Sequence, residues 1–425
     1  MRFLILFMIQ GLLMAASINE ITFKTTKIPM VFEQDTHLPI VSMQLVFKNA
    51  GHLQNHIHGL ADMSAKLLNE GTTKAGSSGF ATKLDAKAVD ITAHVGRESF
   101  IIELSSLKSE FPYAVERLIE LLKDPNYTEH ALAQIKYQKL GWLQQKQSDF
   151  DYIAASKLRE ILFKGSSLAD PHDGTVESIE KIKLKDIKSF INTHLGYNNI
   201  IGVIGGDITQ EEAENTLVKI LNFLPKIENK EIEKLTASNK KETIEIHKET
   251  QQAYIFFGAP FSYDYTEKEQ YLAKIAEYIL GGAGFGSRMM EELRVKRGLT
   301  YGIYASLRRT KSVSYMSGYM QTKLSTQDQA KSLIQEVVNT FINNGITQEE
   351  LKTTKQFLLG SEPLRTETLS QRLGRAYNDY YYDRPLHFSK DQLNHIASVT
   401  LSEVNMFIKK HTELRDISFA IVTKK

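Results

Sequence analysis

The periodicity of apolar positions divides the chain into strands and helices in an order that is repeated. Two strand-like runs come first, the clearer at Ile40–Phe47, and a short amphipathic helix follows at Leu60–Asn69 with Leu60, Met63 and Leu67 on its apolar side. The pattern then predicts a helix over Ser78–Val89, strands at Asp90–Val95 and Ser99–Leu104, helices from Glu110 to about Thr193, a buried strand at Asn199–Ile204, and a helix over Glu211–Phe223.

A charged segment separates this series from a second one. Residues 226–245, KIENKEIEKLTASNKKETIE, are poor in large apolar groups, which favours a linker. After it we expect a strand at Ala253–Gly258, a helix over Glu267–Leu280, a glycine loop, a helix from Arg288, strands at Thr300–Leu307 and Ser312–Gln321, further helices, and a closing strand at Ile417–Val422.

The two series suggest a divergent internal duplication of about 200 residues per copy. The mixed order of elements favours an α+β fold over a doubly wound sheet. We therefore expect two homologous domains, 18–225 and 246–425, each a mainly antiparallel sheet packed against helices and joined by the charged linker 226–245.

The first residues resemble a secretory signal. Met1 and Arg2 give a positive start, Phe3–Ala16 is uncharged and mostly apolar, and small residues follow up to Ser17. The run is short for a spanning helix, which needs about 20 residues. We expect cleavage near residue 17 and secretion, to the periplasm, with no stable membrane span afterwards; a retained anchor or a buried helix is the alternative.

Charge and cysteine content exclude some functions. Lys and Arg number 52 and Asp and Glu 50, a formal net charge of +2, so nothing in the overall field favours nucleic acid as a partner. The chain has no cysteine, which excludes disulfides, thiolate metal sites and cysteine nucleophiles.

Three histidines, His52, His56 and His58, lie within seven residues ahead of Gly59. The first two have the i,i+4 spacing of a zinc site on a helix, but their segment has no helical periodicity and no Glu at metallopeptidase spacing. We interpret them as polar residues of a surface loop; a ligand cluster serving an autonomous peptidase is the alternative.

The glycine loop contains Gly281, Gly282, Gly284 and Gly286. A dinucleotide fingerprint needs a preceding strand and G-x-G-x-x-G spacing, and a P-loop needs Gly-Lys-Ser/Thr; neither is present. A flexible loop that lets the backbone approach an extended ligand fits the residues better.

The stretch SRMMEELRVKRGLTYGIYAS, 287–306, resembles the second-domain motif of the pitrilysin/insulinase/mitochondrial processing peptidase family. Three further stretches carry the same resemblance, so that it covers nearly the whole chain after the signal: GLADMSAKLLNEGTTK, DPHDGTVESIEKIKLKDIKSFINTHLGYNNIIGVIGGDIT and GSEPLRTETLSQRLGRAYNDYYYDRPLHF. The resemblance implies that Arg294 and Tyr301 are the pair that binds the peptide carbonyl beside the zinc ion.

The chain departs from the family at the zinc site. The motif His-x-x-Glu-His, aligned on Gly59, falls on Asp62, Ala65 and Lys66. The third ligand of the family is a Glu about 75 residues onward, and ALAQIKYQKLGWLQQKQ, 131–147, contains no carboxylate. All four zinc-site groups are thus replaced, and Asp62 is expected to form a surface ion pair with Lys66 at i,i+4.

These departures suggest an enzyme whose active site is divided between two chains. We expect no metal or other cofactor in this chain and zinc in a partner chain of the same family that carries His-x-x-Glu-His. Alone the chain would be inactive; with its partner it would contribute Arg294 and Tyr301 to hydrolysis of extended peptides. A catalytically inert peptide-binding or scaffold protein of the same family is the alternative.

Overall fold

The computed structural model describes residues 16–229, 231–266, 268–385 and 387–425. The expected signal sequence lies outside these residues, apart from Ala16 and Ser17.

The first half of the chain forms a six-stranded sheet with helices packed against it. The strand order is β1-β2-β6-β3-β5-β4, with β2 and β6 parallel and the other neighbours antiparallel. The strands are β1 (Ser17–Phe23), β2 (Thr26–Gln34), β3 (Ile40–Lys48), β4 (Asp90–Val95), β5 (Ser99–Leu107) and β6 (Ile200–Gly206). The helices are α1 (Leu60–Leu68), α2 (Gly76–Asp85), α3 (Phe111–Lys123), α4 (Glu129–Lys146), α5 (Phe150–Leu162), α6 (Val176–Lys181), α7 (Leu184–His194) and α8 (Gln210–Leu221), with a short 3-10 turn η1 (His52–Gln54).

The second half forms a five-stranded sheet in the order β7-β11-β8-β10-β9. Its strands are β7 (Thr243–His247), β8 (Gln252–Pro260), β9 (Ile303–Arg309), β10 (Ser314–Lys323) and β11 (Ser418–Thr423). Its helices are α9 (Gln270–Glu277), α10 (Gln327–Asn344), α11 (Gln348–Gly360), α12 (Leu369–Tyr381), α13 (Phe388–Ser398) and α14 (Leu401–Lys410). Two π-helical segments, η3 (Tyr278–Gly282) and η5 (Met290–Val295), and a 3-10 turn, η4 (Gly284–Gly286), lie between α9 and β9.

The two sheets repeat one topology. The order β2-β6-β3-β5-β4 of the first sheet corresponds strand by strand to β7-β11-β8-β10-β9 of the second. In each, the closing strand lies parallel to the first strand of the series and antiparallel to the next. The expected α+β fold with two homologous, mainly antiparallel domains is therefore confirmed.

Strand β7 begins at Thr243, inside the segment that the sequence suggested as linker. It is an edge strand that pairs with β11 on one side only, and its residues alternate between exposed and half-buried. Such a strand needs few apolar residues, which is why the charged composition concealed it.

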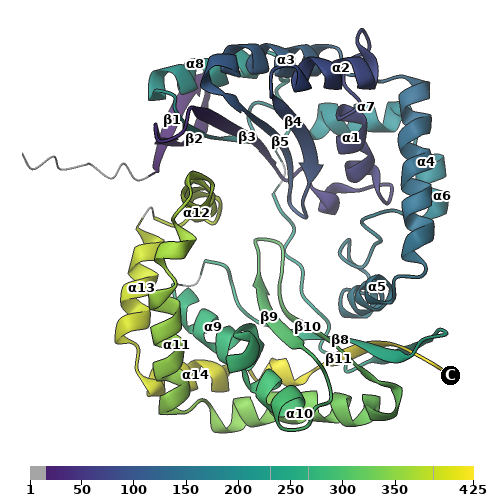
Figure 1. Cartoon of the computed structure of the whole chain (residues 1–425), viewed down its shortest axis with the longest axis vertical. Helices are drawn as coiled ribbons and strands as arrows, with labels where there is room; N and C mark the ends of the chain where they lie inside the picture. Colours follow the sequence, from purple (N-terminus) through teal and green to yellow (C-terminus); the bar gives the residue numbers. More distant parts are fainter. Residues whose placement is uncertain (1–15, 230, 267, 386) are drawn as a thin grey trace, which may run out of the picture.

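One helix from each half packs against the sheet of the other half. Helix α5 packs against the second sheet, where Leu158 and Leu162 share a buried cluster with Val313 and Ala420. Helix α12 packs in the same way against the first sheet, where Leu373 and Ala376 join a cluster that includes Val31, Val46, Ile201 and Val203. Figure 1 shows α12 beneath β1 and β2 and α5 beside β8 and β11. The exchange joins the two halves into one molecule.

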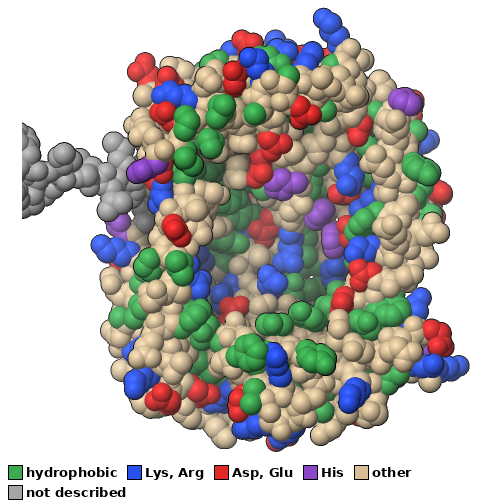
Figure 2. Space-filling model, viewed as in Figure 1, with side chains coloured by type: hydrophobic (Ala, Val, Ile, Leu, Met, Phe, Trp, Pro, Cys, Tyr) green, Lys and Arg blue, Asp and Glu red, His purple; other side chains and the backbone are tan. Residues whose placement is uncertain are grey.

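Figure 2 shows a hollow between the halves in which charged and histidine side chains are visible. Within the part of the chain that the structure describes, no helix combines the length and the apolar character needed to cross a lipid bilayer.

Candidate functional site

Helix α1 carries the three positions of the degenerate zinc motif. Ala65 is buried at 3 % exposure, Asp62 is half-buried, and Lys66 points into solvent. Gly59 precedes the helix with a φ of 85°, and a Cβ on it would lie 3.0 Å from Gly174 Cα. A glycine is needed here because the 173–174 segment packs directly on the start of the helix.

A lysine from α4 supplies the cation of this site. The Lys139 ammonium lies 2.9 Å from Asp62 Oδ2 and 3.3 Å from Asp173 Oδ1, and its residue is only 5 % exposed. It also lies 4.2 Å from the centre of the Trp142 ring, a cation–π contact. The expected ion pair of Asp62 with Lys66 is therefore wrong: Asp62 pairs with Lys139, because a half-buried carboxylate is stabilised more by a buried cation than by a solvated one.

The groups around Lys139 form a closed network. The Tyr152 hydroxyl donates to Asp173 Oδ2 at 3.3 Å, and His172 Nε2 lies 3.2 Å from the same oxygen. Burial of the carboxyl disfavours its charge, but the neighbouring cation and hydrogen bonds outweigh burial and hold the pKa of Asp173 below its ordinary value.

This network does not fit a zinc ion. Zinc takes lone pairs from Cys, His or carboxylate side chains, usually four in a structural site and three in a catalytic one. Here Asp62 is already neutralised by an internal ammonium, and Lys66 would repel the ion. Among the described residues, no group of three or more His, Asp or Glu side chains is placed to hold a metal ion.

The three loop histidines do not converge. His52 lies on η1 and contacts His172, with 5.1 Å between ring centres, whereas His56 is exposed. His58 Nε2 lies 3.5 Å from an oxygen of Asp170. His52 is half-buried on its short turn, and burial lowers its pKa from 6.5 to about 4.

Arg294 and Tyr301 lie on the second half, at η5 and just before β9. Tyr301 is 89 % exposed, and a turn in which Thr300 bonds both the backbone N–H and the C=O of Gly302 holds it outward. The Arg294 guanidinium lies 4.2 Å from the Phe285 ring centre and makes no ion pair with any residue that the structure describes. Tyr301 is therefore free to meet another molecule, whereas Arg294 is half-buried with its guanidinium over the Phe285 ring.

The segment that holds this pair is fixed at its start. Arg288 bonds both carboxylate oxygens of Glu350, at 2.6 and 2.8 Å, and donates to Gly345 O at 2.7 Å. A two-point contact of this kind restrains orientation as well as distance. The motif residue next to the glycine loop thus anchors η5 to α11.

The glycines of the loop have different roles. A Cβ on Gly281 would lie 2.6 Å from Ala305 Cβ, so this position allows η3 to pack on β9. Gly284 has a φ of 55°, and Gly282 and Gly286 are exposed; a Cβ would lie 3.1 Å from Glu277 O at Gly282 but make only an ordinary contact at Gly286. The role of the loop in binding an extended ligand stays a prediction.

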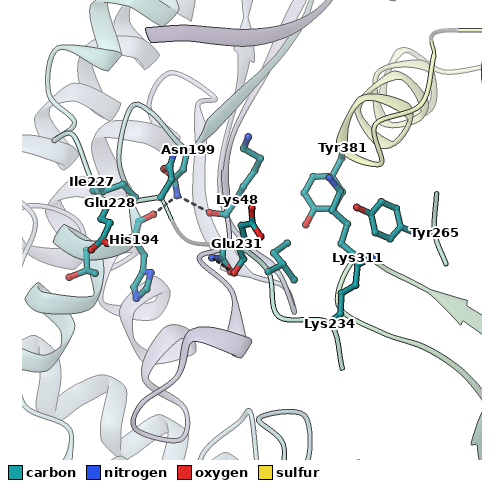
Figure 3. A pocket seen from close by; sticks show the side chains of 14 residues that line it. Lys48, His194, Asn199, Ile227, Glu228, Glu231, Lys234, Tyr265, Lys311 and Tyr381 are labelled. Carbon is teal, nitrogen blue, oxygen red and sulfur yellow. Dashed lines mark hydrogen bonds between the residues drawn. The ribbon is translucent and has the colours of Figure 1, made fainter. Parts of the chain in front are cut away.

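A cavity of about 490 Å³ lies at the seam between the halves and is drawn in Figure 3. Asn199 Nδ2 donates to the carbonyl oxygens of Lys48 and His194, both at 2.8 Å. Burial and the neighbouring charge of Lys311 lower the pKa of Lys48. The other two lysines of the cavity have carboxylate partners, Lys234 with Asp264 and Lys311 with Asp383. The chain itself therefore neutralises most of the charge at the seam.

Comparison with known proteins establishes the family. The chain is 42 % identical over 414 residues to the non-peptidase homologue YmxG of Helicobacter pylori, which covers 97 % of this chain and 96 % of that one. The chain belongs to peptidase family M16. Residues 30–176 match the description Insulinase (Peptidase family M16), and residues 181–358 match Peptidase M16 inactive domain.

Solved structures share the M16 fold along the whole chain. A peptidase M16 inactive domain from Pseudomonas fluorescens has a TM-score of 0.88 at 23 % identity, covering 96 % of this chain and 98 % of that one. A protease from Helicobacter pylori has a TM-score of 0.81 at 15 % identity, covering 96 % of this chain and 100 % of that one.

Several residues of the site were absent from the sequence-based prediction. These are Lys139, His172 and Asp173 of the buried network, and Arg97 and Arg159, which line a cavity of about 390 Å³ that His172 also lines. Their local sequence patterns are those of ordinary surface residues on turns and helices. Periodicity within one element does not predict which residues of another element it will contact. Two of them, His172 and Asp173, lie in the DPHDG stretch that resembles the family, and Lys139 lies in the carboxylate-free stretch 131–147.

Proposed function

We propose that this M16 member is the zinc-free subunit of a two-chain peptidase. The main support is the contrast between the degenerate zinc motif of the first half and the Arg294/Tyr301 pair of the second. In the first half, Asp62 of the degenerate zinc motif is held in an internal ion pair with Lys139, whereas Tyr301 of the second half is 89 % exposed and Arg294 forms no ion pair among the described residues. Such donors suit a site that a second chain completes.

The chemistry assigned to this chain is transition-state binding. A peptide carbonyl oxygen gains negative charge as water adds to the carbon, and preorganised donors stabilise that charge. The Tyr301 hydroxyl and the Arg294 guanidinium supply an O–H and several N–H donors, the latter charge-assisted. The metal and the general base would belong to the partner.

One organism has both a non-peptidase homologue of this chain and a protease of the same fold. Helicobacter pylori has a non-peptidase homologue 42 % identical to this chain, and also a protease with the same fold. This supports a zinc-bearing family member as the partner, with no metal or other cofactor in this chain.

Substrates are proposed to be extended peptides that add a strand to a sheet edge. Strand β9 is an edge strand, and Tyr301 lies two residues before it. Unpaired backbone groups of an edge accept a further strand, and neighbouring side chains select its sequence. The apolar run Phe3–Ala16 supports a secreted, periplasmic destination.

The test is to co-purify the full chain with a zinc-bearing M16 chain from the same organism and to measure peptide hydrolysis and zinc content. Arg294→Ala or Tyr301→Phe should lower kcat by about 10²–10³, the effect of removing one oxyanion donor, with zinc content unchanged. Arg297→Ala is the matched control, because Arg297 pairs with Glu292 in the same segment.

Full activity in both variants would refute the donated site. A stable complex in which this chain adds no activity would instead show an inert scaffold or peptide-binding subunit. The isolated chain is expected to cleave no peptide and to hold no stoichiometric zinc.

A further inference from the structure

A cavity of about 390 Å³ opens beside the buried Lys139 network and is lined from both halves. The turn between β4 and β5 contributes Arg97, α5 contributes Arg159, and the sheet of the second half contributes Phe256 and Tyr315. The backbone fixes Arg97, since Leu53 N donates to its carbonyl oxygen at 3.2 Å. The cavity is thus part of the built structure rather than a gap between loops.

Two guanidinium groups share this cavity without a carboxylate partner. Arg97 donates to the Tyr315 hydroxyl at 3.1 Å, and Arg159 Nε is buried without a hydrogen-bond partner. Neither arginine forms an ion pair within the described ranges. The carboxylate in the lining, Asp170, lies next to His58, and Asp173 nearby is bound to Lys139.

This arrangement leaves both guanidinium groups without a direct carboxylate contact. Burial lowers the pKa of Arg159 and the like charge of Arg97 acts in the same direction, whereas the nearby carboxylate of Asp173 acts against both. Two guanidinium groups on one cavity repel each other unless an anion lies between them. His52 and His172 add ring nitrogens to the wall, and burial keeps both neutral at pH 7 by lowering their pKa.

A row of aromatic rings leads away from the cavity across the second sheet. Phe256 of the lining stacks on Tyr319 at 5.5 Å, and Tyr319 stacks on Tyr304 at 5.8 Å. The three residues are register partners on β8, β10 and β9. Tyr304 and Tyr319 remain 45 % and 39 % exposed, so the row offers an apolar surface that ends three residues from Tyr301.

We propose that Arg97 and Arg159 bind a carboxylate of a peptide, whose adjoining apolar residues lie on the row Phe256, Tyr319 and Tyr304. Guanidinium groups bind carboxylates through charge-assisted and often two-point hydrogen bonds. Aromatic rings stack on apolar side chains without fixing a sequence. The inference deepens the proposed function by naming its substrate class, peptides that combine a carboxylate with apolar residues.

The carboxylate can come from a free C-terminus or from an acidic side chain, and the ligands distinguish the two. Fluorescently labelled apolar peptides would be used in three forms: with a free C-terminus and no acid, with an amidated C-terminus and no acid, and amidated with one internal Glu. Binding to the isolated full chain is measured by anisotropy. The free-acid form, the internal-Glu form or both should bind at least tenfold more tightly than the amide without acid, as expected for a hydrogen bond between charged groups.

Two variants test the cavity itself. Arg159→Met removes one charge at similar volume and should weaken the acidic peptides about tenfold or more, with little effect on the amide. Ala155→Asp places a carboxylate in the lining and should weaken binding in the same way while raising the unfolding midpoint. Lys164→Met is the control, because Lys164 is an exposed cation that follows α5 outside the cavity.

Ala155→Asp keeps the test informative even if Arg159→Met unfolds the protein. Equal binding of all three peptides would overturn the proposal, as would acidic-peptide binding that Ala155→Asp leaves unchanged. Because these measurements use the isolated chain, they are independent of activity with a partner. A chain that binds acidic peptides yet adds nothing to a zinc-bearing partner would retain this inference and refute the proposed function.

Discussion

The ammonium of Lys139 determines the charge balance of the first-half site. Its side chain is buried between two carboxylates and an indole ring, and one of the carboxylates, Asp62, is a position of the degenerate zinc motif. A lysine provides one positive charge and hydrogen-bond donors but no Lewis acidity. The site therefore retains its electrostatic balance without the chemistry of a metal.

We predict that Lys139→Met lowers the free energy of unfolding by about 3 kcal/mol, because it leaves Asp62 and Asp173 without their cation. Both carboxylates are partly exposed, so the loss should lie at the low end for a broken buried pair. Urea denaturation measures it. Lys66→Met is the control and should change stability by less than about 0.5 kcal/mol. If Lys66→Met lowered the free energy of unfolding more than Lys139→Met, that result would favour the Asp62–Lys66 ion pair expected from helix spacing.

The glycine loop shows how one residue positions an element. Gly281 allows η3 to lie against Ala305 of β9, the strand that Tyr301 precedes. We predict that Gly281→Ala destabilises the chain by about 1–3 kcal/mol, the usual cost of overpacking, and lowers activity in the complex. Thermal unfolding and peptide hydrolysis are the measurements.

Gly286→Ala is the matched control within the same loop. A Cβ there would meet Ala283 Cβ at 3.6 Å, an ordinary contact, and its φ is not positive. If flexibility of the loop rather than packing were decisive, both substitutions would reduce activity to a similar degree with little change in stability.

At the scale of helices and strands, the sequence predicts most of the fold, because each long element has its own hydrophobic periodicity. The strands β8, β10 and β11 and the helix α1 lie close to their predicted positions. Strand β7 was concealed by its charged composition, and the Asp62–Lys139 contact by the distance between α1 and α4 in the chain. Helical spacing predicts which residues are neighbours on one helix, but tertiary packing determines which cation a carboxylate pairs with.

The whole molecule depends on the exchange of α5 and α12 between the halves. Arg372 on α12 reaches the first sheet, where Nε lies 2.5 Å from Glu33 Oε1 and Nη2 lies 2.6 Å from Asp35 Oδ2. Glu33 is only 3 % exposed, and burial raises its pKa above the ordinary value even beside this cation. The contact thus links the halves through a carboxylate that has little access to water.

We predict that Arg372→Met weakens the coupling of the halves by about 3–5 kcal/mol, the cost of leaving a buried charge unpaired. In calorimetry the first half should then unfold separately, at a lower temperature than the second. Arg375→Met is the matched control, since Arg375 lies on the same helix but pairs with Glu362 of its own half. That variant should lower the midpoint without separating the two transitions.

The pH dependence of stability tests whether the buried carboxylate of Glu33 is the cause of this coupling. Without Arg372, the pKa of Glu33 should rise further, and its protonated form needs no cation. The native state would then bind more protons than the unfolded state over the range between the two pKa values, so the variant gains stability as the pH falls. The difference between Arg372→Met and the unaltered chain should therefore narrow from pH 8 to pH 5. A difference that stays constant would assign the coupling to the apolar contacts of Leu373 and Ala376 instead of to the buried carboxylate.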